Sequence, residues 1–344
     1  MLSAEFVLSN YADTYLINCG MSIGNSAVAF HDGFKYMVSR HTNYMLVNEG
    51  GALVPRTRPS DTFSDEFWFQ WESRDNIRQI SCIGCSSSEP QFPLHKYSSF
   101  CGGRGLEDPR LIEWNGKIYA IFTKCHPDDP ETVNIVYAEM LSPWRGIIGN
   151  LHVAVGRQKV EKNWQPVPGH PGTCIYTAGT YGGDFKTTNL FNGVYSTYPG
   201  NDIGAFPLNG STNLLCWGGK PSSRNMIGIM HSRDEEHHYL HYMVEYDSEL
   251  HVKRVSDPFS FTGADVEFTT CIYREEYDIK ILVSIHDQLL YEFCLDSDII
   301  EGILGKTLHK TAHADNLYEQ FARDAAICDN YYGVDGFRTF LEAK

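Results

Sequence analysis

Basic residues are scarce in this sequence relative to acidic ones. Its 344 residues include 28 lysines and arginines against 43 aspartates and glutamates, which gives a formal net charge of −15 at pH 7. Nucleic acids and anionic membrane surfaces are attracted mainly by excess positive charge. The charge balance therefore argues against both as partners.

Long apolar segments are also missing. No 18 apolar residues run together, and the opening MLSAEFVLSN has neither the basic start nor the long apolar stretch of a secretory leader. The ten cysteines are scattered and do not form the dense framework of a small secreted domain. We expect reduced thiols, no membrane insertion and a cytoplasmic protein.

Metal-binding patterns are incomplete. Cys82 and Cys85 form a single CxxC without a second pair at the spacing of a zinc finger. His237, His238 and His241 form an HHxxH run, but the segment has the period of a strand, in which alternate residues share one face. We interpret the run as a partly exposed histidine cluster and predict neither a metal nor another cofactor.

Period-two alternation between turn signals predicts an all-β fold built from hairpins. The strongest signal is Asn115-Gly116, which separates residues 110–114 from 117–123. Comparable groups recur along the chain at 25–40, 239–255 and 267–294. Because such repetition is typical of propeller blades, we predict a β-propeller over residues 1–305. Residues 49–99 are expected to form long loops and a partial blade.

The period becomes helical after residue 313. One face of that segment would carry the apolar residues Leu317, Phe321, Ala325 and Cys328. We predict a short C-terminal helical tail, residues 306–344, that packs on the outside of the propeller. The same face could instead dock a second copy of the chain, as a homo-oligomer, or a neighbouring domain.

The run CGGRGLEDPR, residues 101–110, is the densest group of functional residue types. Pro109 disfavours helical backbone at Asp108, so we expect Glu107 and Asp108 in extended chain with side chains pointing in opposite directions. Arg110 could hold a carboxylate or receive an anionic ligand. A structural turn with an ion pair is the alternative. The glycines match neither the P-loop nor the dinucleotide-binding fingerprint.

Three further segments carry candidate site residues, and the first of them combines a cation, an amide and an indole of the kind that bind sugars. They contribute Lys162, Asn163 and Trp164 from EKNWQPVP; Lys220 from WGGKPS, followed by a strand with His231 and Arg233; and Glu267 after the SDPF run at 256–259. Each of these segments alone is common in loops, so their order along the chain carries the interpretation.

That order resembles glycoside hydrolase family 130 over residues 20–295. The matching features are a hairpin ending near Arg40, the G-x-E-D-P-R motif, Lys162-Asn163, G-G-x-P before the strand with His231, and Glu267. The family comprises five-bladed propellers acting on mannosides, chiefly phosphorylases with some hydrolases. The resemblance therefore implies that the predicted β-propeller of residues 1–305 has five blades. The mannosyl-transferring glycosyltransferase family 108 is similar.

The resemblance implies that Asp108 is the general acid, acting directly or through a sugar hydroxyl, and we predict that it serves as acid or base. The resemblance also implies that Arg40, Arg110, Lys162 and His231 contact sugar or phosphate, and that Glu267 matches a carboxylate of the last blades. We place Glu107 and Glu267 with Asp108 in the candidate catalytic set. To the candidate sugar contacts we add the neighbouring residues Asn43, Asn163, Trp164, Lys220 and Arg233.

One position departs from the family. Its phosphorylases carry an arginine on the strand after the lysine element, whereas residues 172–178 here read GTCIYTA, without a cation. We therefore predict a glycosyltransferase that moves a sugar such as mannose from a nucleotide sugar or sugar phosphate to a glycan acceptor. The alternatives are a phosphorylase or hydrolase of β-mannosides and a non-catalytic glycan-binding propeller.

Overall fold

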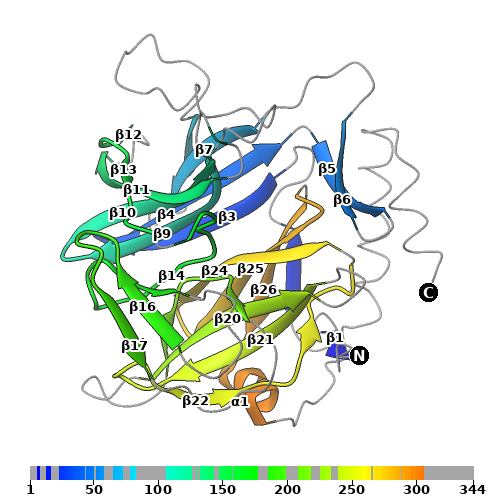
Figure 1. The fold of residues 1–344 in the computed structure, drawn as a ribbon. Coiled ribbons are helices and arrows are strands. Elements are labelled where there is room, and N and C mark those ends of the chain that lie inside the picture. Colours follow the sequence, from blue (N-terminus) through cyan, green and yellow to red (C-terminus); the bar gives the residue numbers. More distant parts are fainter. Residues whose placement is uncertain are drawn as a thin grey trace.

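The described part of the computed structural model consists mainly of β-strands (Figure 1). It describes residues 6–7, 13–16, 23–42, 44–49, 52–57, 65–72, 78–82, 106–125, 129, 132–142, 147–156, 158–176, 185–198, 208–217, 225–233, 239–264, 266–287 and 289–305. The predicted C-terminal helical tail lies outside these residues, as do Asn43 and Lys220 of the predicted site. No helix in the described part of the chain is long and apolar enough to cross a membrane.

The strands form five sheets of four or more strands, which we number in chain order. Sheet 1 contains β3 (Ile23–His31), β4 (Phe34–Thr42), β7 (Asp65–Glu72) and β8 (Arg78–Cys82). Sheet 2 contains β9 (Leu106–Trp114), β10 (Lys117–Cys125), β11 (Val133–Ser142), β12 (Ile147–Ile148) and β13 (His152–Val153). Sheet 3 contains β14 (Gln165–Pro166), β15 (Thr173–Tyr176), β16 (Phe185–Asn189) and β17 (Tyr195–Tyr198).

The remaining sheets combine strands from both ends of the chain. Sheet 4 contains β18 (Asn209–Gly210), β19 (Leu215–Trp217), β20 (Asn225–Arg233), β21 (Tyr239–Tyr246), β22 (Val252–Val255), β23 (Phe259–Ser260) and the N-terminal β1 (Phe6–Val7). Sheet 5 contains β24 (Glu267–Glu275), β25 (Asp278–Ile285), β26 (Leu289–Leu295) and β2 (Asp13–Leu16). A separate hairpin joins β5 (Tyr44–Glu49) and β6 (Ala52–Thr57), and the one described helix is α1 (Ser297–Gly305).

This arrangement confirms the predicted all-β propeller. The N-terminal β2 pairs with β26, the last described strand, so that sheet 5 contains both an early and a late segment of the chain. Such pairing closes a ring of sheets and leaves fewer open strand edges. The count of five blades stays a prediction, although five larger sheets are described.

The predicted tight turns are present. Asn115 and Gly116 have φ values of +52° and +73°, and Asp32 and Gly33 have +49° and +80°. Positive φ at both central positions is the requirement of the hairpin turn that Asn-Gly and Asp-Gly favour. These turns fix the registers of β9 with β10 and of β3 with β4.

Strands β3, β9 and β24 are edge strands of sheets 1, 2 and 5 that lie against one another, and each carries a β-bulge. The pairing registers put the extra residues at Gly24–Asn25 of β3, Asp108–Pro109 of β9 and Thr270 of β24. A bulge re-aims side chains and increases local twist. The three bulges therefore direct side chains toward the neighbouring sheets.

Side chains connect consecutive sheets by hydrogen bonds to the backbone. The donor and acceptor pairs are Trp114 Nε1 to Val167 O (2.8 Å), Gln165 Nε2 to Ile229 O (2.8 Å), Asn213 Nδ2 to Ile272 O (2.9 Å), and Thr270 Oγ1 to Ser26 O. Buried backbone groups left without partners would cost free energy, so these bonds satisfy the polar atoms where sheets meet.

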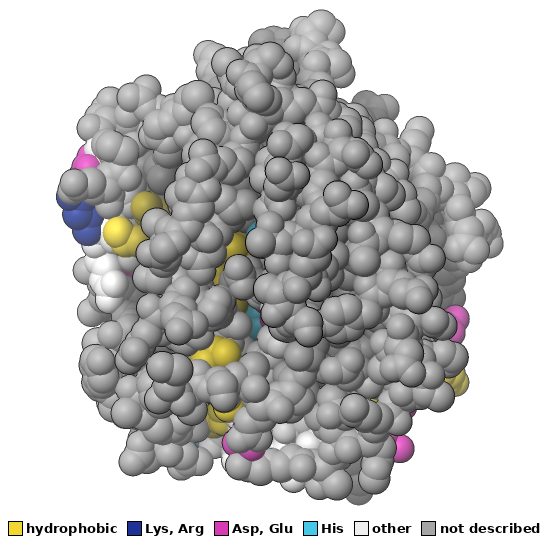
Figure 2. All heavy atoms as spheres, turned by 90° about the vertical axis from the view of Figure 1, so that its right-hand side faces the viewer, with side chains coloured by type: hydrophobic (Ala, Val, Ile, Leu, Met, Phe, Trp, Pro, Cys, Tyr) yellow, Lys and Arg dark blue, Asp and Glu magenta, His cyan; other side chains and the backbone are white. Residues whose placement is uncertain are grey.

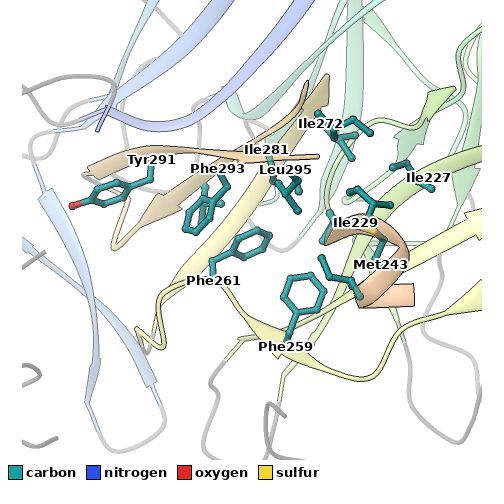
Figure 3. Packing of buried hydrophobic residues seen from close by; sticks show 14 of the residues in the cluster. Ile227, Ile229, Met243, Phe259, Phe261, Ile272, Ile281, Tyr291, Phe293 and Leu295 are labelled. Carbon is teal, nitrogen blue, oxygen red and sulfur yellow. The ribbon is translucent and has the colours of Figure 1, made fainter. Parts of the chain in front are cut away.

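One of the two large hydrophobic cores in the described part of the chain lies between sheets 4 and 5 (Figure 3). Phe259, Phe261 and Phe293 stack edge-on there, with ring centroids 5.0–5.3 Å apart along the row. Full burial of one such side chain contributes about 1.5–3 kcal/mol. Helix α1, which the sequence analysis did not anticipate, adds Ile300 and Ile303 to the same core.

Candidate functional site

Asp108 lies on the bulge of β9, where the inner edges of sheets 1 and 2 meet. Its backbone φ is +49°, and its Oδ1 accepts a hydrogen bond of 2.5 Å from Asn25 Nδ2 on the bulge of β3. Pro109 suits the bulge because it has no N–H to contribute to the strand ladder. The half-buried carboxylate is thereby held between two sheets while it stays accessible to solvent.

The expected extended backbone at Asp108 is wrong. A φ of +49° is in the left-handed region, which non-glycine residues seldom occupy. The cause is the extra residue of the bulge, since Glu107 pairs with Thr123 and Arg110 with Ile121. Strained backbone of this kind is frequent at functional sites, where the surrounding structure stabilises it.

Arg110 follows on the same strand and is 3% exposed. Its Nη1 donates to the backbone carbonyl of Asp108 at 2.8 Å, and its Nε has no hydrogen-bond partner among the described residues. Burial lowers the pKa of the guanidinium, and the nearby charge of Asp108 opposes that shift. A buried cation with an unused donor is suited to bind an anion.

Arg40 joins Glu107 to the turn between β25 and β26. Its Nη2 is 3.9 Å from Glu107 Oε1, and its Nη1 is 3.6 Å from Asp287 Oδ2. The side chains belong to sheets 1, 2 and 5. Asp287 was not among the predicted site residues.

A second group of side chains approaches from sheet 4. His231 lies on β20, and its Nδ1 is 2.7 Å from Ser211 Oγ. Burial lowers the pKa of His231, and the positive charges of Arg233, Lys162 and Arg110 lower it further. Charges interact more strongly inside a protein than in water, and the interaction weakens as their distance grows. The loop with Lys162 and strand β9 with Arg110 therefore lie near His231.

Tyr239 connects the two groups. Arg233 stacks over its ring at 4.6 Å from the centroid and also hydrogen-bonds its hydroxyl. Burial raises the pKa of Tyr239; Arg233 opposes this shift, and the carboxylates of Asp287 and Asp108 add to it. Tyr239 thus lies within electrostatic reach of both carboxylates and of a cation.

The loop before β14 presents Lys162 to solvent. Asn163 follows with φ +63°, and a Cβ on Gly210 of β18 would lie 2.3 Å from its carbonyl oxygen. Because only glycine permits this approach, the loop packs directly against sheet 4. Gly210 is opposite Met230 in the ladder, one position from His231. This packing explains why Lys162 lies near His231.

Trp164 does not lie at the surface as a sugar-stacking ring would. It is 2% exposed, packs with Ile112 and Cys174, and donates from Nε1 to Glu161 Oε2 at 3.3 Å. Glu161 also accepts from Gln158 N at 2.6 Å. The predicted sugar contact is therefore corrected: Trp164 anchors the loop that carries Lys162.

Glu267 also requires a correction, because it is 0% exposed. Its carboxylate accepts hydrogen bonds from the backbone N–H groups of Phe261 (2.6 Å) and Thr262 (2.9 Å), and lies 3.5 Å from His241 Nε2. Burial raises the pKa of Glu267 to about 7 and lowers that of His241 to about 3. Glu267 braces a turn instead of facing a substrate, and His241 is buried instead of partly exposed.

Sequence analysis missed Asn25, Tyr239 and Asp287. The signal for Asp287 was present as the two-residue turn His286-Asp287, where both residues have positive φ, +53° and +59°. Asn25 gave no signal, because its role depends on a bulge. No group of metal-binding side chains occurs in the described part of the chain. On the face shown in Figure 2, histidine side chains are visible among hydrophobic ones near the centre.

A scan against protein-family models finds no match, and a search of curated proteins finds none. Among solved structures, the fold is similar to a β-1,2-mannobiose phosphorylase from Listeria innocua, with a TM-score of 0.54 at 13% identity over 87% of this chain and 97% of that one. It is also similar to a glycosyl hydrolase from Bacteroides ovatus, with a TM-score of 0.52 at 10% identity over 85% and 92% of the two chains.

A third similar structure represents the GH130 family of mannoside phosphorylases, which contains hydrolases that target β-1,2-mannosidic linkages in Candida mannan. Its TM-score is 0.52 at 12% identity, over 83% of this chain and 87% of that one. At these identities the likeness establishes the fold. The fold agrees with that of the family which the sequence resembles.

Proposed function

We propose that this protein is a carbohydrate-active enzyme in which Asp108 serves as acid or base. The observation that carries the proposal is the position of this carboxylate, on a strained bulge and hydrogen-bonded to Asn25 across a junction between two sheets. Strained, partly exposed carboxylates beside cations are typical of catalytic sites.

The reaction proposed is transfer of a sugar from a phosphate-bearing donor to a hydroxyl of a glycan. The acceptor oxygen forms a bond to the anomeric carbon and its proton passes to Asp108. The bond from that carbon to the donor phosphate breaks, and its electron pair leaves with the phosphate. Arg110, Lys162 and Arg233 supply positive charge where negative charge develops on the leaving group.

Mannose is the sugar we propose. The order of motifs resembles a family that acts on mannosides, and the neighbours in fold include enzymes described by their mannoside substrates. The absence of a cation on β15 (Thr173–Tyr176) supports transfer over phosphorolysis, because a free phosphate dianion is usually held by two or three convergent cations.

The alternative is a phosphorylase or hydrolase of β-mannosides. It is favoured by one observation: the solved structures with similar folds include a phosphorylase and a glycosyl hydrolase. A non-catalytic glycan-binding propeller is the second alternative. Asp108 argues for an enzyme over a binding module, since a lectin site does not need a strained carboxylate beside a buried cation.

The test is incubation with nucleotide sugars, sugar 1-phosphates and mannosides, with and without glycan acceptors. We expect sugar transfer from an activated donor and no cleavage of mannosides with phosphate present. Sugar 1-phosphate release from a β-mannoside would overturn the transferase and establish the alternative. Sugar binding without turnover of any compound would favour the non-catalytic glycan-binding propeller.

Ligand-dependent melting gives a second, turnover-independent measurement. A nucleoside diphosphate or its sugar should raise the melting temperature, because a ligand that binds only the folded state stabilises it. Millimolar inorganic phosphate should not. A shift with phosphate as large as that with a nucleoside diphosphate would contradict the proposed donor class.

A further inference from the structure

Arg40 touches three sheets at the point where the candidate site is built. It belongs to β4 of sheet 1, is 3% exposed, and lies 3.9 Å from Glu107 of sheet 2 and 3.6 Å from Asp287 of sheet 5. Both of its terminal nitrogens face carboxylates of the protein, so its charge is used within the protein. Its position suits an interaction with protein groups.

Both of its carboxylate partners lie close to Asp108. Glu107 precedes Asp108 in the chain, and Asp287 and Asp108 both act on the ionisation of Tyr239. Three carboxylates near one another repel unless a cation compensates them. Arg40 provides that charge from a planar group with several donors. Loss of Arg40 would therefore push Glu107 and Asp287 away from their present positions.

Backbone packing makes such movement reach Asp108. A Cβ on Gly24 would lie 3.0 Å from Asp287 O and 3.6 Å from Arg40 O, so the turn with Asp287 packs directly on the β3 bulge. The next residue, Asn25, donates the 2.5 Å hydrogen bond to Asp108. A shift of the turn thus displaces the group that orients the carboxylate.

We propose that Arg40 is a positioning residue: it holds Glu107 and Asp287 and thereby fixes the Asn25–Asp108 pair, instead of contacting the phosphate of a donor. This inference replaces the direct ligand contact implied by the family resemblance. It rests on the proposed function in that Asp108 performs the proton transfer.

The kinetic test compares Arg40→Gln, Arg40→Lys, Asp287→Asn and the double variant Arg40→Gln/Asp287→Asn. Displacement of a catalytic group by about 1 Å can cost about 100-fold in rate, so we expect Arg40→Gln to lower kcat by about that factor with KM changed less than about threefold. Arg40→Lys should recover part of the loss. The fold-loss of kcat in the double variant should be at least about tenfold smaller than the product of the fold-losses in the two single variants.

Lys162→Gln is the matched control, because Lys162 is an exposed cation of the same site. If it contacts the donor, its loss raises the donor KM. The positioning role would be overturned if Arg40→Gln raised the donor KM, left kcat unchanged and had effects additive to those of Asp287→Asn.

The same four variants are compared by urea unfolding without any ligand. We expect the shift in midpoint of the double variant to be smaller than the sum of the single shifts. Additive shifts would refute the contact between Arg40 and Asp287 whatever the activity. If the shifts are coupled but the protein turns over no substrate, the proposed function is refuted and the contact between Arg40 and Asp287 still stands. If Arg40→Gln does not fold, the milder Arg40→Lys takes its place in the comparison.

Discussion

The junction of sheets 5 and 1 and the junction of sheets 1 and 2 use the same structural device for different ends. Each brings a bulge of one edge strand against the next sheet. At the first junction, Thr270 accepts a 3.0 Å hydrogen bond from Ser26 N and donates to Ser26 O. At the second, Asp108 accepts one bond from the side chain of Asn25.

The difference lies in what remains available for a ligand. Thr270 is buried, and its hydroxyl both accepts and donates within the protein. Asp108 is half-buried, and its other carboxylate oxygen has no hydrogen-bond partner among the described residues. The bulge with Thr270 presents a hydroxyl whose hydrogen bonds are made within the protein, so it joins two sheets. The bulge with Asp108 presents a carboxylate that can still accept a hydrogen bond or a proton, so it can take part in a reaction.

The largest effect should follow from changing the carboxylate itself. Asp108→Asn keeps the shape and removes the proton-transferring group, so we expect turnover to fall by about 10²–10⁴-fold. Sugar binding and the urea midpoint should change little. This prediction is tested by measuring kcat on the substrate that the incubation experiment identifies, together with the binding of the same sugar. A loss below about tenfold would contradict the role of Asp108.

The tight turns show what a single sequence predicts well. Asn115-Gly116 requires only local backbone preferences, and its positive φ values follow from the residue types alone. The two strands that it joins were placed to within a few residues, because period-two alternation depends on the burial of one sheet face.

The bulges show what it does not predict. Whether Asn25 or Asp108 is an extra residue depends on the register of the partner strand, which local sequence does not encode. The sequence also does not show which polar side chains are buried. Trp164 and Glu267 both carry polar groups that suit a sugar site, but both make their hydrogen bonds within the protein. Residue type indicates what a side chain can do, and packing decides whether it faces a ligand.

A change of Thr270, at the junction of sheets 5 and 1, should lower stability and leave the turnover rate nearly unchanged. Thr270→Val keeps the volume but leaves Ser26 N–H and C=O without these partners, so the free energy of unfolding should fall by about 1–3 kcal/mol. Turnover of the folded variant should stay within about threefold of the parent. Urea unfolding and kcat measured well below the midpoint test this. A large loss of kcat with unchanged stability would make the two junctions equivalent.

A third junction, between sheets 4 and 5, uses buried ionisable groups for structure. The raised pKa of Glu267, about 7 against 4.5, means that its protonated form favours folding and that its contribution is lost as pH rises from 4.5 through 7. The lowered pKa of His241, about 3 against 6.5, means that its contribution is lost as pH falls below 6.5. Between pH 4.5 and 6.5 the two trends oppose each other.

Single variants should expose each trend. In Glu267→Gln, the difference in unfolding free energy from the parent should rise with pH between 4.5 and 6.5, by up to about 1.4 kcal/mol per pH unit. In His241→Phe the same difference should fall with pH. Urea titrations at several pH values measure both slopes. Slopes of the same sign would show that the two groups do not titrate as an opposed pair.

The smallest effect should come from an exposed ion pair on sheet 2. Lys117 Nζ is 2.9 Å from Glu139 Oε2, closer than Arg40 is to either of its partners. Both side chains are solvated, so water screens the attraction and ordering two long side chains offsets it. Lys117→Met should therefore leave the urea midpoint unchanged, at low and at high salt, whereas Arg40→Gln lowers it. Equal shifts in the two variants would mean that distance, and not burial, decides which charge pair holds the sheets together.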